Sequence, residues 1–280
     1  MGKWPRRFAY LLVALLGVAL LAYGGIYTAS ERVLHHHYAT PAVTVPLIPQ
    51  DAASLAEGER IAILRGCTGC HDHLYGDVFD SEPLIGTLVA PNLTQVLQKY
   101  SDADLVRLLR YGVRPSGESV FVMPSTMFYY LSDADLGKLM AYLRKVAPVN
   151  HELPPDSVGF LGRWYVARHD PDFQLIAETT LTFPARPDFG PPAVSAKYGE
   201  YLARSVCTEC HAPDLKGYPG DTPDLVIAKG YSREQFTRLM RTGIAVGDRD
   251  LRLMSDVARS RFSHFSDAEV EALYLYLQAR

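Results

Sequence analysis

The sequence predicts a mainly α-helical protein in which two copies of one small module follow a single N-terminal transmembrane helix. Three observations predict this class: an uncharged apolar run near the N-terminus, blocks of sequence that recur in the same order, and helix start signals at the head of those blocks. A length of 280 residues accommodates two such domains.

The apolar run covers residues 8–27. Twenty residues at about 1.5 Å per residue give roughly 30 Å, the thickness of the hydrocarbon core of a bilayer. Lys3, Arg6 and Arg7 precede the run, so the positive-inside rule places the N-terminus in the cytoplasm and exports the remaining chain. We therefore expect a membrane anchor over residues 1–30. A cleaved signal peptide is the alternative, although its apolar region is usually only about 7–15 residues long.

The exported part is mildly acidic. The chain has 28 basic and 31 acidic residues and a formal charge of −3. The three basic residues at the N-terminus are the only charges before Glu31, so 25 basic and 31 acidic residues remain beyond residue 30, a charge near −6. Because nucleic acid binding needs a basic face, nucleic acid is not an expected partner.

The internal repeat consists of four blocks. Each block of the first copy has a counterpart in the second. Gly58-Glu59 matches Gly199-Glu200, and Cys67–His71 matches Cys207–His211. Residues 100–113 match residues 231–244, and residues 131–143 match residues 265–277. The last two blocks open with a serine followed by Asp, Gln or Glu three residues later, which resembles a helix capping box. No useful stretch shows the two-residue alternation of a β-strand. We expect helical copies over residues 51–148 and 191–280.

Two segments lie outside the copies. Residues 31–50 contain three prolines and few charges, which predicts an extended spacer. Residues 149–190 are rich in proline and predict an interdomain segment that packs on the surface, with a short helix around residues 160–168. The three histidines at 35–37 are expected to form a solvated face beside the membrane rather than a metal site.

The four cysteines form two Cys-x-x-Cys-His motifs, the attachment signature of c-type haem. Their residues are Cys67, Cys70 and His71, and Cys207, Cys210 and His211. Two thiols bond the haem vinyl groups, and the next imidazole reaches the iron. A zinc Cys₄ site would need closer pairs, disulfides would close strained four-residue loops, and thioredoxin chemistry needs a βαβ context. We expect two covalently bound haem c groups with His71 and His211 as axial ligands.

A second axial ligand is expected later in each copy. Pro124 biases Met123 away from helical backbone, so this side chain can project from a loop. We therefore prefer Met123 to Met127. In the second copy we prefer Met254, in the irregular stretch before the last helix, to His264. Histidine–methionine ligation raises the reduction potential relative to ligation by two histidines, and it fills both axial positions of the iron, which suits an electron carrier.

Together these motifs resemble class I-like cytochrome c modules, and the chain is similar to membrane-anchored dihaem cytochromes c of bacterial respiratory chains. Besides the two Cys-x-x-Cys-His motifs and the terminal helices, the resemblance is carried by residues 90–94, 111–117 and 123–125. It covers about residues 50–150 and 190–280 and implies two tandem cytochrome c domains. The chain also resembles cytochrome subunits of periplasmic dehydrogenases, which usually carry three haem modules instead of two.

The resemblance implies two further features in each copy. A glycine near the start of the first helix meets an aromatic residue of the last helix, because a missing Cβ permits a close crossing. A proline carbonyl orients the imidazole that binds the iron; loop punctuation is the alternative role for these prolines. The matching residues are Gly58 with Tyr142, Gly199 with Tyr276, Pro91 and Pro223.

We therefore expect an electron carrier, or an electron-transfer subunit of a larger oxidoreductase complex, rather than an enzyme. Its single anchor would lie in the lipid of a bacterial inner membrane, with the haem domains on the periplasmic side. The donor would be a dehydrogenase or a quinol-oxidising complex, and the acceptor a cytochrome, an oxidase or a reaction centre. A dihaem peroxidase, which needs one open iron, and a redox or gas sensor are the alternatives.

Overall fold

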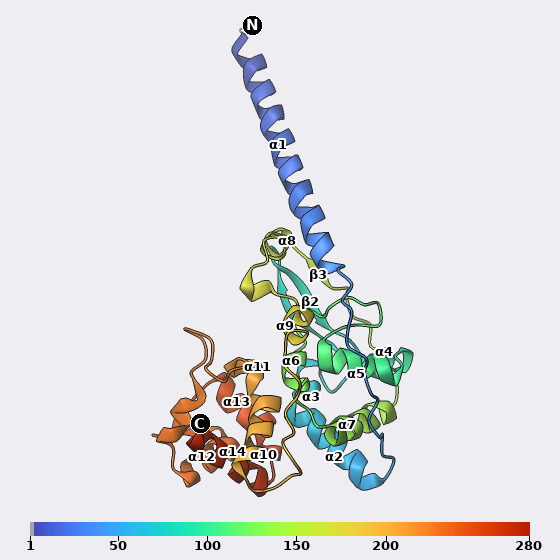
Figure 1. Ribbon diagram of the computed structural model, residues 1–280. Helices are drawn as coiled ribbons and strands as arrows, with labels where there is room; N and C mark the ends of the chain where they lie inside the picture. The colour runs from blue at the N-terminus through green and yellow to red at the C-terminus, as the bar shows by residue number, and fades with distance from the viewer. Residues whose placement is uncertain (1–2) are drawn as a thin grey trace.

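The computed structural model describes residues 3–280 and is mainly helical, with a long helix projecting from a two-lobed globular part (Figure 1). The helix is α1 (Lys3–Leu34). The first lobe runs from α2 to α7, the second from α10 to α14, and the two lie side by side below α1. Each lobe has its own cluster of buried apolar side chains.

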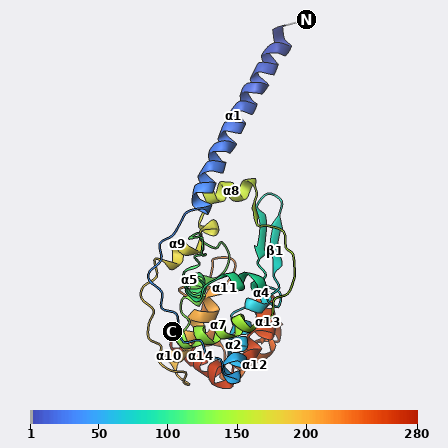
Figure 2. The same ribbon diagram turned by 90° about the vertical axis from the view of Figure 1, so that its right-hand side faces the viewer.

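Helix α1 stands free of the lobes over most of its length (Figure 2). Its apolar side chains are exposed, and it is the one described helix that is long and apolar enough to cross a membrane. The helix continues four residues beyond the expected anchor of residues 1–30, because Glu31 and Arg32 extend it as a polar final turn. The predicted N-terminal helix is thus present in the structure.

The first lobe is built on a crossing of its first and last helices, α2 and α7. Its helices are α2 (Ala52–Leu64), α3 (Cys67–Cys70), α4 (Leu93–Val96), η1 (Leu97–Lys99), α5 (Asp102–Tyr111), α6 (Ser125–Phe128) and α7 (Asp133–Lys145). The expected start of α5 is a complete capping box between Ser101 and Asp104. At α7, only the Ser132 half of the box forms.

The second lobe repeats this plan with α10 and α14 as the crossing pair. Its elements are α10 (Ala196–Leu202), η3 (Ala203–Cys207), α11 (Thr208–His211), η4 (Leu225–Gly230), α12 (Arg233–Thr242), β4 (Ile244–Ala245), β5 (Arg249–Asp250), α13 (Leu253–Ser260), η5 (Phe262–His264) and α14 (Asp267–Ala279). Complete capping boxes begin α12 at Ser232 and α14 at Ser266.

Both crossings depend on a glycine. A Cβ at Gly58 would collide with the Lys138 carbonyl oxygen and lie 2.9 Å from the Tyr142 Cβ. A Cβ at Gly199 would collide with the Ala272 carbonyl oxygen and lie 2.7 Å from the Tyr276 Cβ. Since no side chain fits there, only glycine permits these approaches. The two expected glycine–tyrosine contacts are confirmed.

A small antiparallel sheet departs from the all-helical expectation for the first copy. Strand β1 (Asp77–Glu82) pairs with β2 (Gly86–Ala90), which also pairs with β3 (Ser157–Val158). Every residue of β1 is exposed, and the pairing with β2 is interrupted by a bulge. A strand with solvent on both faces needs no apolar–polar alternation, so the sequence carried no periodic signal for it.

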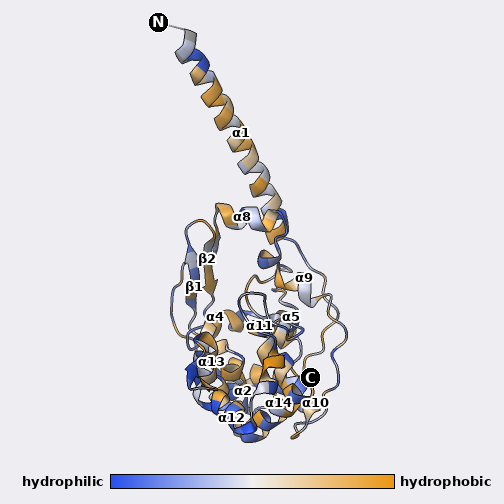
Figure 3. Ribbon diagram, turned by 90° about the vertical axis from the view of Figure 1, so that its left-hand side faces the viewer, coloured by the Kyte–Doolittle hydropathy of each residue, from blue (hydrophilic) through white to orange (hydrophobic). Residues whose placement is uncertain are grey.

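The two segments outside the lobes pack mainly on the first lobe, and Phe189 at the end of the second segment packs on the core of the second lobe. Val43 and Ile48 contact its core, and the Leu47 carbonyl lies against Gly137, so residues 31–50 are held rather than free. The proline-rich segment contains the expected short helix, α8 (Phe160–Ala167), followed by η2 (Pro171–Phe173) and α9 (Ile176–Thr180). Helix α8 packs beside the foot of α1 (Figure 3).

Candidate functional site

Each Cys-x-x-Cys-His motif follows directly on the first helix of its lobe. In the first lobe, α2 ends near Arg65, and Gly66 reverses the chain with a φ of +76° to begin α3 at Cys67. In the second lobe, α10 passes without a break into the π-helical turn η3, which ends at Cys207. Both motifs therefore lie on a helical turn, where side chains three residues apart share one face.

The imidazoles of both motifs are fixed by a carbonyl group. The Nδ1 atom of His71 lies 2.8 Å from the carbonyl oxygen of Pro91, and Nδ1 of His211 lies 2.8 Å from that of Pro223. A carbonyl only accepts hydrogen bonds, so Nδ1 carries the proton and Nε2 keeps a free lone pair. Burial lowers the pKa of both histidines, which favours this neutral form.

The four cysteines are free thiols in the structure. Burial raises the pKa of Cys67 and Cys207 to about 12, unlike the low thiol pKa of thiol–disulfide enzymes. Within residues 3–280, no three His, Cys, Asp or Glu side chains converge on a common metal position. The structure therefore shows no disulfide and no Cys₄ cluster among the residues it describes.

The two preferred methionines occupy matching places. Met123 follows Gly112, which ends α5, by eleven residues, and Met254 follows Gly243, which ends α12, by the same eleven. Both methionine side chains are half-buried and pack against the core of their own lobe. The two methionines therefore stand at the same distance after the end of the preceding helix.

The two alternative ligand residues, Met127 and His264, have different surroundings from the preferred methionines. Met127 is completely buried in the first core, and His264 is exposed. One local expectation was wrong: Met254 lies in the first turn of α13 and not in an irregular stretch. This helix begins at Arg252 without a side-chain cap, so its start has no signature in the sequence.

Two arginines that the sequence reasoning missed hold the segment between the methionine and the last helix. Arg110 is buried, and its guanidinium donates to the Tyr129 carbonyl over 2.7 Å and to the Asp133 carboxylate over 2.8 Å. Arg241 makes the equivalent bonds to the Ser263 carbonyl and the Asp267 carboxylate. Both arginines stand at the same position in the repeated blocks, two residues before the glycine that ends the helix. This shared position was the signal in the sequence that identifies them as a matching pair.

The two lobes meet through pairs that the repeat makes equivalent. Arg60, two residues after Gly58, donates to the Glu269 carboxylate over 2.7 and 2.9 Å. Tyr201, two residues after Gly199, donates to the Asp135 carboxylate. Glu269 and Asp135 are the matching third residues of α14 and α7. Asp135 bonds the other lobe in place of its own backbone, which is why its capping box is incomplete.

A third contact joins two residues that are equivalent to each other. Arg65 and Ser205 both stand two residues before the first cysteine of their motif, and Nη2 of Arg65 donates to Oγ of Ser205 over 3.0 Å. Both side chains are buried. A contact between equivalent positions of two copies is typical of an interface with two-fold symmetry. The lobes therefore pair about an approximate two-fold axis close to both motifs.

Arg261 of the second lobe touches both motifs. Its Nη1 donates to the carboxylate of Glu209, inside the second motif, over 2.7 Å. Its Nη2 lies 3.9 Å from the Sγ of Cys70 in the first, and its guanidinium covers Gly66. Any side chain at Gly66 would collide with this group. The two motifs therefore lie on either side of one half-buried arginine at the interface between the lobes.

The residues present fit covalently attached haem c. Each lobe offers two unbonded thiols on one helical turn, an imidazole whose Nε2 is free because Nδ1 is already bonded, and a half-buried thioether against an apolar core. These are the donors that c-type haem takes in proteins.

No protein-family model matches the chain. Among curated proteins it is similar to the cytochrome c subunit of a quinone-dependent alcohol dehydrogenase from Gluconobacter oxydans, at 24% identity over 82% of this chain and 55% of that protein. The chain is a relative of dehydrogenase cytochrome c subunits. The fructose dehydrogenase cytochrome subunit of Gluconobacter japonicus is 23% identical over 81% of the chain and 52% of its own length.

A third relative is the alcohol dehydrogenase cytochrome c subunit of Gluconacetobacter polyoxogenes, at 24% identity over 82% of the chain and 56% of that protein. The chain thus spans about half the length of the curated relatives it matches. All three relatives are named as cytochrome subunits of dehydrogenases, which agrees with the resemblance found in the sequence. None of these three relatives is a peroxidase, so the peroxidase alternative gains no support.

Proposed function

We propose that this chain is a membrane-anchored dihaem cytochrome c that passes electrons between a dehydrogenase or quinol-oxidising complex and a downstream cytochrome, oxidase or reaction centre. The observation that carries the proposal is the pair of Cys-x-x-Cys-His motifs, each with its imidazole bonded to a proline carbonyl, on the two sides of one interface. The dehydrogenase relatives favour a donor of that class.

The residues proposed to bind the two haem c groups are of the same types in both lobes. Cys67 and Cys70 in the first lobe, and Cys207 and Cys210 in the second, would form the thioether bonds. His71 with Met123, and His211 with Met254, would supply the axial ligands. Bound haem c would provide an iron that accepts and releases single electrons.

The surrounding protein prepares these ligands in advance. The bonds from the two histidines to Pro91 and Pro223 fix the ring orientation and leave Nε2 as the donor atom. Arg110 and Arg241 tie down the segment that follows each methionine, so the thioether is held near its lobe without a long free loop. Little rearrangement would then accompany a change of charge at either site.

The fixed pairing of the lobes favours electron transfer between the two proposed haem sites. Arg60–Glu269, Tyr201–Asp135 and Arg65–Ser205 hold the lobes in one arrangement, and Arg261 spans the remaining gap between the motifs. Electrons entering either lobe would therefore have a short, fixed route to the other. A flexible tether between independent lobes would not offer this.

The proposed membrane location rests on α1. Its exposed apolar surface and the basic residues in its first turns favour a single pass through a bacterial inner membrane, with both lobes on the periplasmic side. Anchoring would keep the carrier at the surface where a membrane dehydrogenase releases its electrons.

The function is tested in membranes of the source bacterium with and without the gene. We expect ethanol or fructose to reduce the haem bands of this chain, and deletion of the gene to lower the matching oxygen consumption. Unchanged oxygen consumption with every dehydrogenase substrate and with quinol would contradict the proposal. Carbon monoxide added to the reduced, purified protein should leave its spectrum unchanged, whereas a shift would indicate an open iron and favour a peroxidase or gas sensor.

A further inference from the structure

Helix α8 occupies an unusual place in the molecule. It lies at the end of the globular part nearest α1 and runs crosswise to it (Figures 2 and 3). A helix perpendicular to a membrane-crossing helix, at the level where that helix emerges, lies along the membrane surface. Its place raises the question of whether α8 itself meets the lipid.

The contacts between the helices fix the depth of α8. The Phe160 ring stacks on Tyr23 of α1, with the ring centroids 5.9 Å apart. Tyr23 lies four residues inside the apolar run that ends at Tyr27, which corresponds to about 6 Å along the helix. If residues 8–27 fill the hydrocarbon core, Phe160 is therefore level with its outer edge and not above it.

The only charged side chain within α8 is turned toward α1. Arg163 donates to the Glu31 carboxylate over 2.6 Å and to the Ser30 hydroxyl over 2.9 Å, and its guanidinium lies 4.1 Å from the centre of the Tyr27 ring. The Arg163 side chain is only 14% exposed. Its charge is thus neutralised at the foot of α1, and it fixes the angle between the helices.

In contrast to Arg163, two large apolar side chains of α8 are exposed. Phe160 and Trp164 stand four residues apart, on one face of α8, and are 47% and 45% exposed. The turn of the β1–β2 hairpin packs on the start of α8 through a 2.9 Å bond from the Leu161 amide to the Leu84 carbonyl, and Leu84 is 59% exposed. Phe160, Trp164 and Leu84 form what we call the apolar rim.

We propose that the apolar rim inserts into the outer-leaflet interface of the membrane and sets the height and tilt of the two lobes. This inference rests on the proposed anchoring by α1. A lipid surface is the occupant that the rim fits, because Phe160 stacks on Tyr23 inside the apolar run of α1, and Arg163, the only charged residue of α8, is paired with Glu31. Aromatic side chains are the residues that favour the lipid interface.

The consequence for electron transfer is one of geometry. A single helix alone would let the whole molecule tilt about the point where α1 leaves the bilayer. A second attachment beside α1 limits that tilt, so the same faces of the two lobes would be presented to partners in the same membrane. The rim therefore acts as a positioning surface and takes no part in the electron path.

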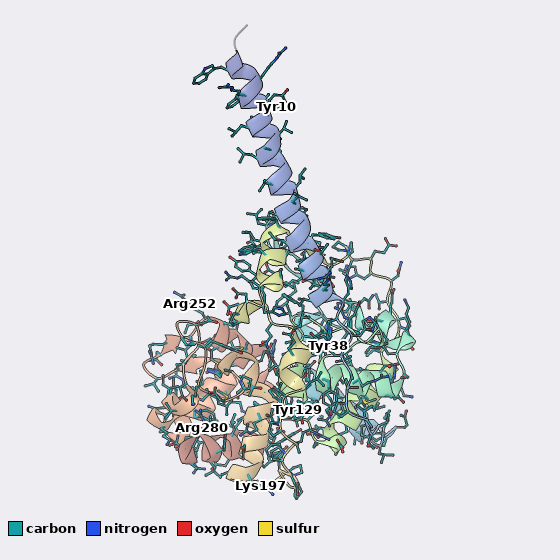
Figure 4. All side chains as sticks on the ribbon, turned by 45° about the horizontal axis from the view of Figure 1, so that its top comes forward. Tyr10, Tyr38, Tyr129, Lys197, Arg252 and Arg280 are labelled. Carbon is teal, nitrogen blue, oxygen red and sulfur yellow. The ribbon has the colours of Figure 1, made fainter. Side chains whose placement is uncertain are left out.

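The test uses nitroxide labels on the full chain in lipid nanodiscs, measured in the reduced state. The thiols of the haem motifs are bonded in the proposed holoprotein, so an introduced cysteine is the only reactive one. Labels are placed with Trp164→Cys and Phe160→Cys on the rim, with Leu16→Cys in the middle of α1, and with Lys197→Cys as a water control. Lys197 lies at the end of the molecule away from α1 (Figure 4).

We expect the ratio of collision with oxygen to collision with a water-soluble nickel complex to be several-fold higher at both rim labels than at Lys197→Cys. If the rim labels are as accessible to water as the control while Leu16→Cys lies in the hydrocarbon, insertion of the rim is contradicted and anchoring by α1 is not. A water-accessible Leu16→Cys would overturn the anchor itself. Rim labels shielded from both reagents would show a protein partner there, and this too would overturn the lipid assignment.

Discussion

Arg65 and Ser205 occupy the same position in the two copies of the repeat, and they bond each other across the interface between the lobes over 3.0 Å. A bond between equivalent positions places the approximate two-fold axis beside the two Cys-x-x-Cys-His motifs. Internal duplication has therefore produced a pair of lobes that associate as two subunits of a symmetric dimer do.

Removal of the Met123 thioether is expected to change the first haem while the lobe stays folded. Met123→Ala should abolish the sulfur-to-iron charge-transfer band of that haem and lower its reduction potential, because a ligand that favours ferrous iron is lost. The control is Met127→Ala, which removes a fully buried core side chain and should cost about 2–5 kcal/mol of stability with the band retained. Absorption spectra and thermal melts of both variants separate the two roles; the reverse pattern would make Met127 the ligand.

Loss of the Arg261 charge is expected to lower the reduction potentials of both haems. Arg261 touches both motifs, and a nearby positive charge disfavours the additional positive charge of the ferric state. Arg261→Met introduces the residue that stands at the equivalent place, Met127, and should lower both potentials by tens of millivolts, on the scale where 59 mV equals about 1.4 kcal/mol. Arg261→Lys, which keeps the charge, should stay near wild type in a redox titration. A shift confined to one haem would mean that Arg261 does not lie between the two.

Acid is expected to loosen the contact between the lobes. Burial alone would raise the pKa of Glu269, but the bonds from Arg60 and from the Ser266 amide hold this pKa below its ordinary value of 4.5. A lowered pKa in the folded state means that the contact stabilises the protein above about pH 4.5 and is lost as the pH falls through the folded value. Calorimetry from pH 7 to pH 3 should show one transition separating into two.

The control for this pH effect is the neutral variant. Glu269→Gln should lose about 1–2 kcal/mol at pH 7, since Arg60 keeps its bond to Glu57, and should flatten the acid dependence. Glu271→Gln on the same helix, whose partner Arg233 belongs to its own lobe, should retain the wild-type dependence. An unaltered acid transition in Glu269→Gln would show that other carboxylates control the separation.

A methyl group at the second helix crossing is expected to destabilise the second lobe. Gly199→Ala places a Cβ against the Ala272 carbonyl oxygen and should cost about 1–3 kcal/mol or more, because backbone cannot move aside as a side chain can. Gly230→Ala has open space around the new methyl group and should change stability by less than about 0.5 kcal/mol. Denaturant melts compare the two; equal stabilities would mean that α10 and α14 adjust freely.

The repeat is what made much of the structure predictable from sequence. Duplicated serines marked the starts of α5, α7, α12 and α14. The glycine–tyrosine pairs at the two crossings were expected from the resemblance to cytochrome c modules, which the matching motifs carry. These features are local or recur at a fixed offset, so a single sequence reveals them. The long apolar α1 was equally visible because its length matches a bilayer.

The remaining features depend on contacts between distant segments. Strand β1 is exposed on both faces and so lacks a periodic pattern. Helix α13 begins without a capping side chain, which left Met254 misplaced in an irregular stretch. The bridge from Arg261 to both motifs, and the packing of α8 on α1, join residues far apart in the chain and have no local signature.

The central claim is that both Cys-x-x-Cys-His motifs carry thioether-linked haem. Intact-mass spectrometry of the mature protein, expressed with a cytochrome c maturation system and denatured before analysis, measures this directly. The account predicts the mass of the polypeptide plus two haem groups, with the mass of one haem removed in Cys67→Ser/Cys70→Ser and in Cys207→Ser/Cys210→Ser. A wild-type mass with one added haem, or none, would contradict it.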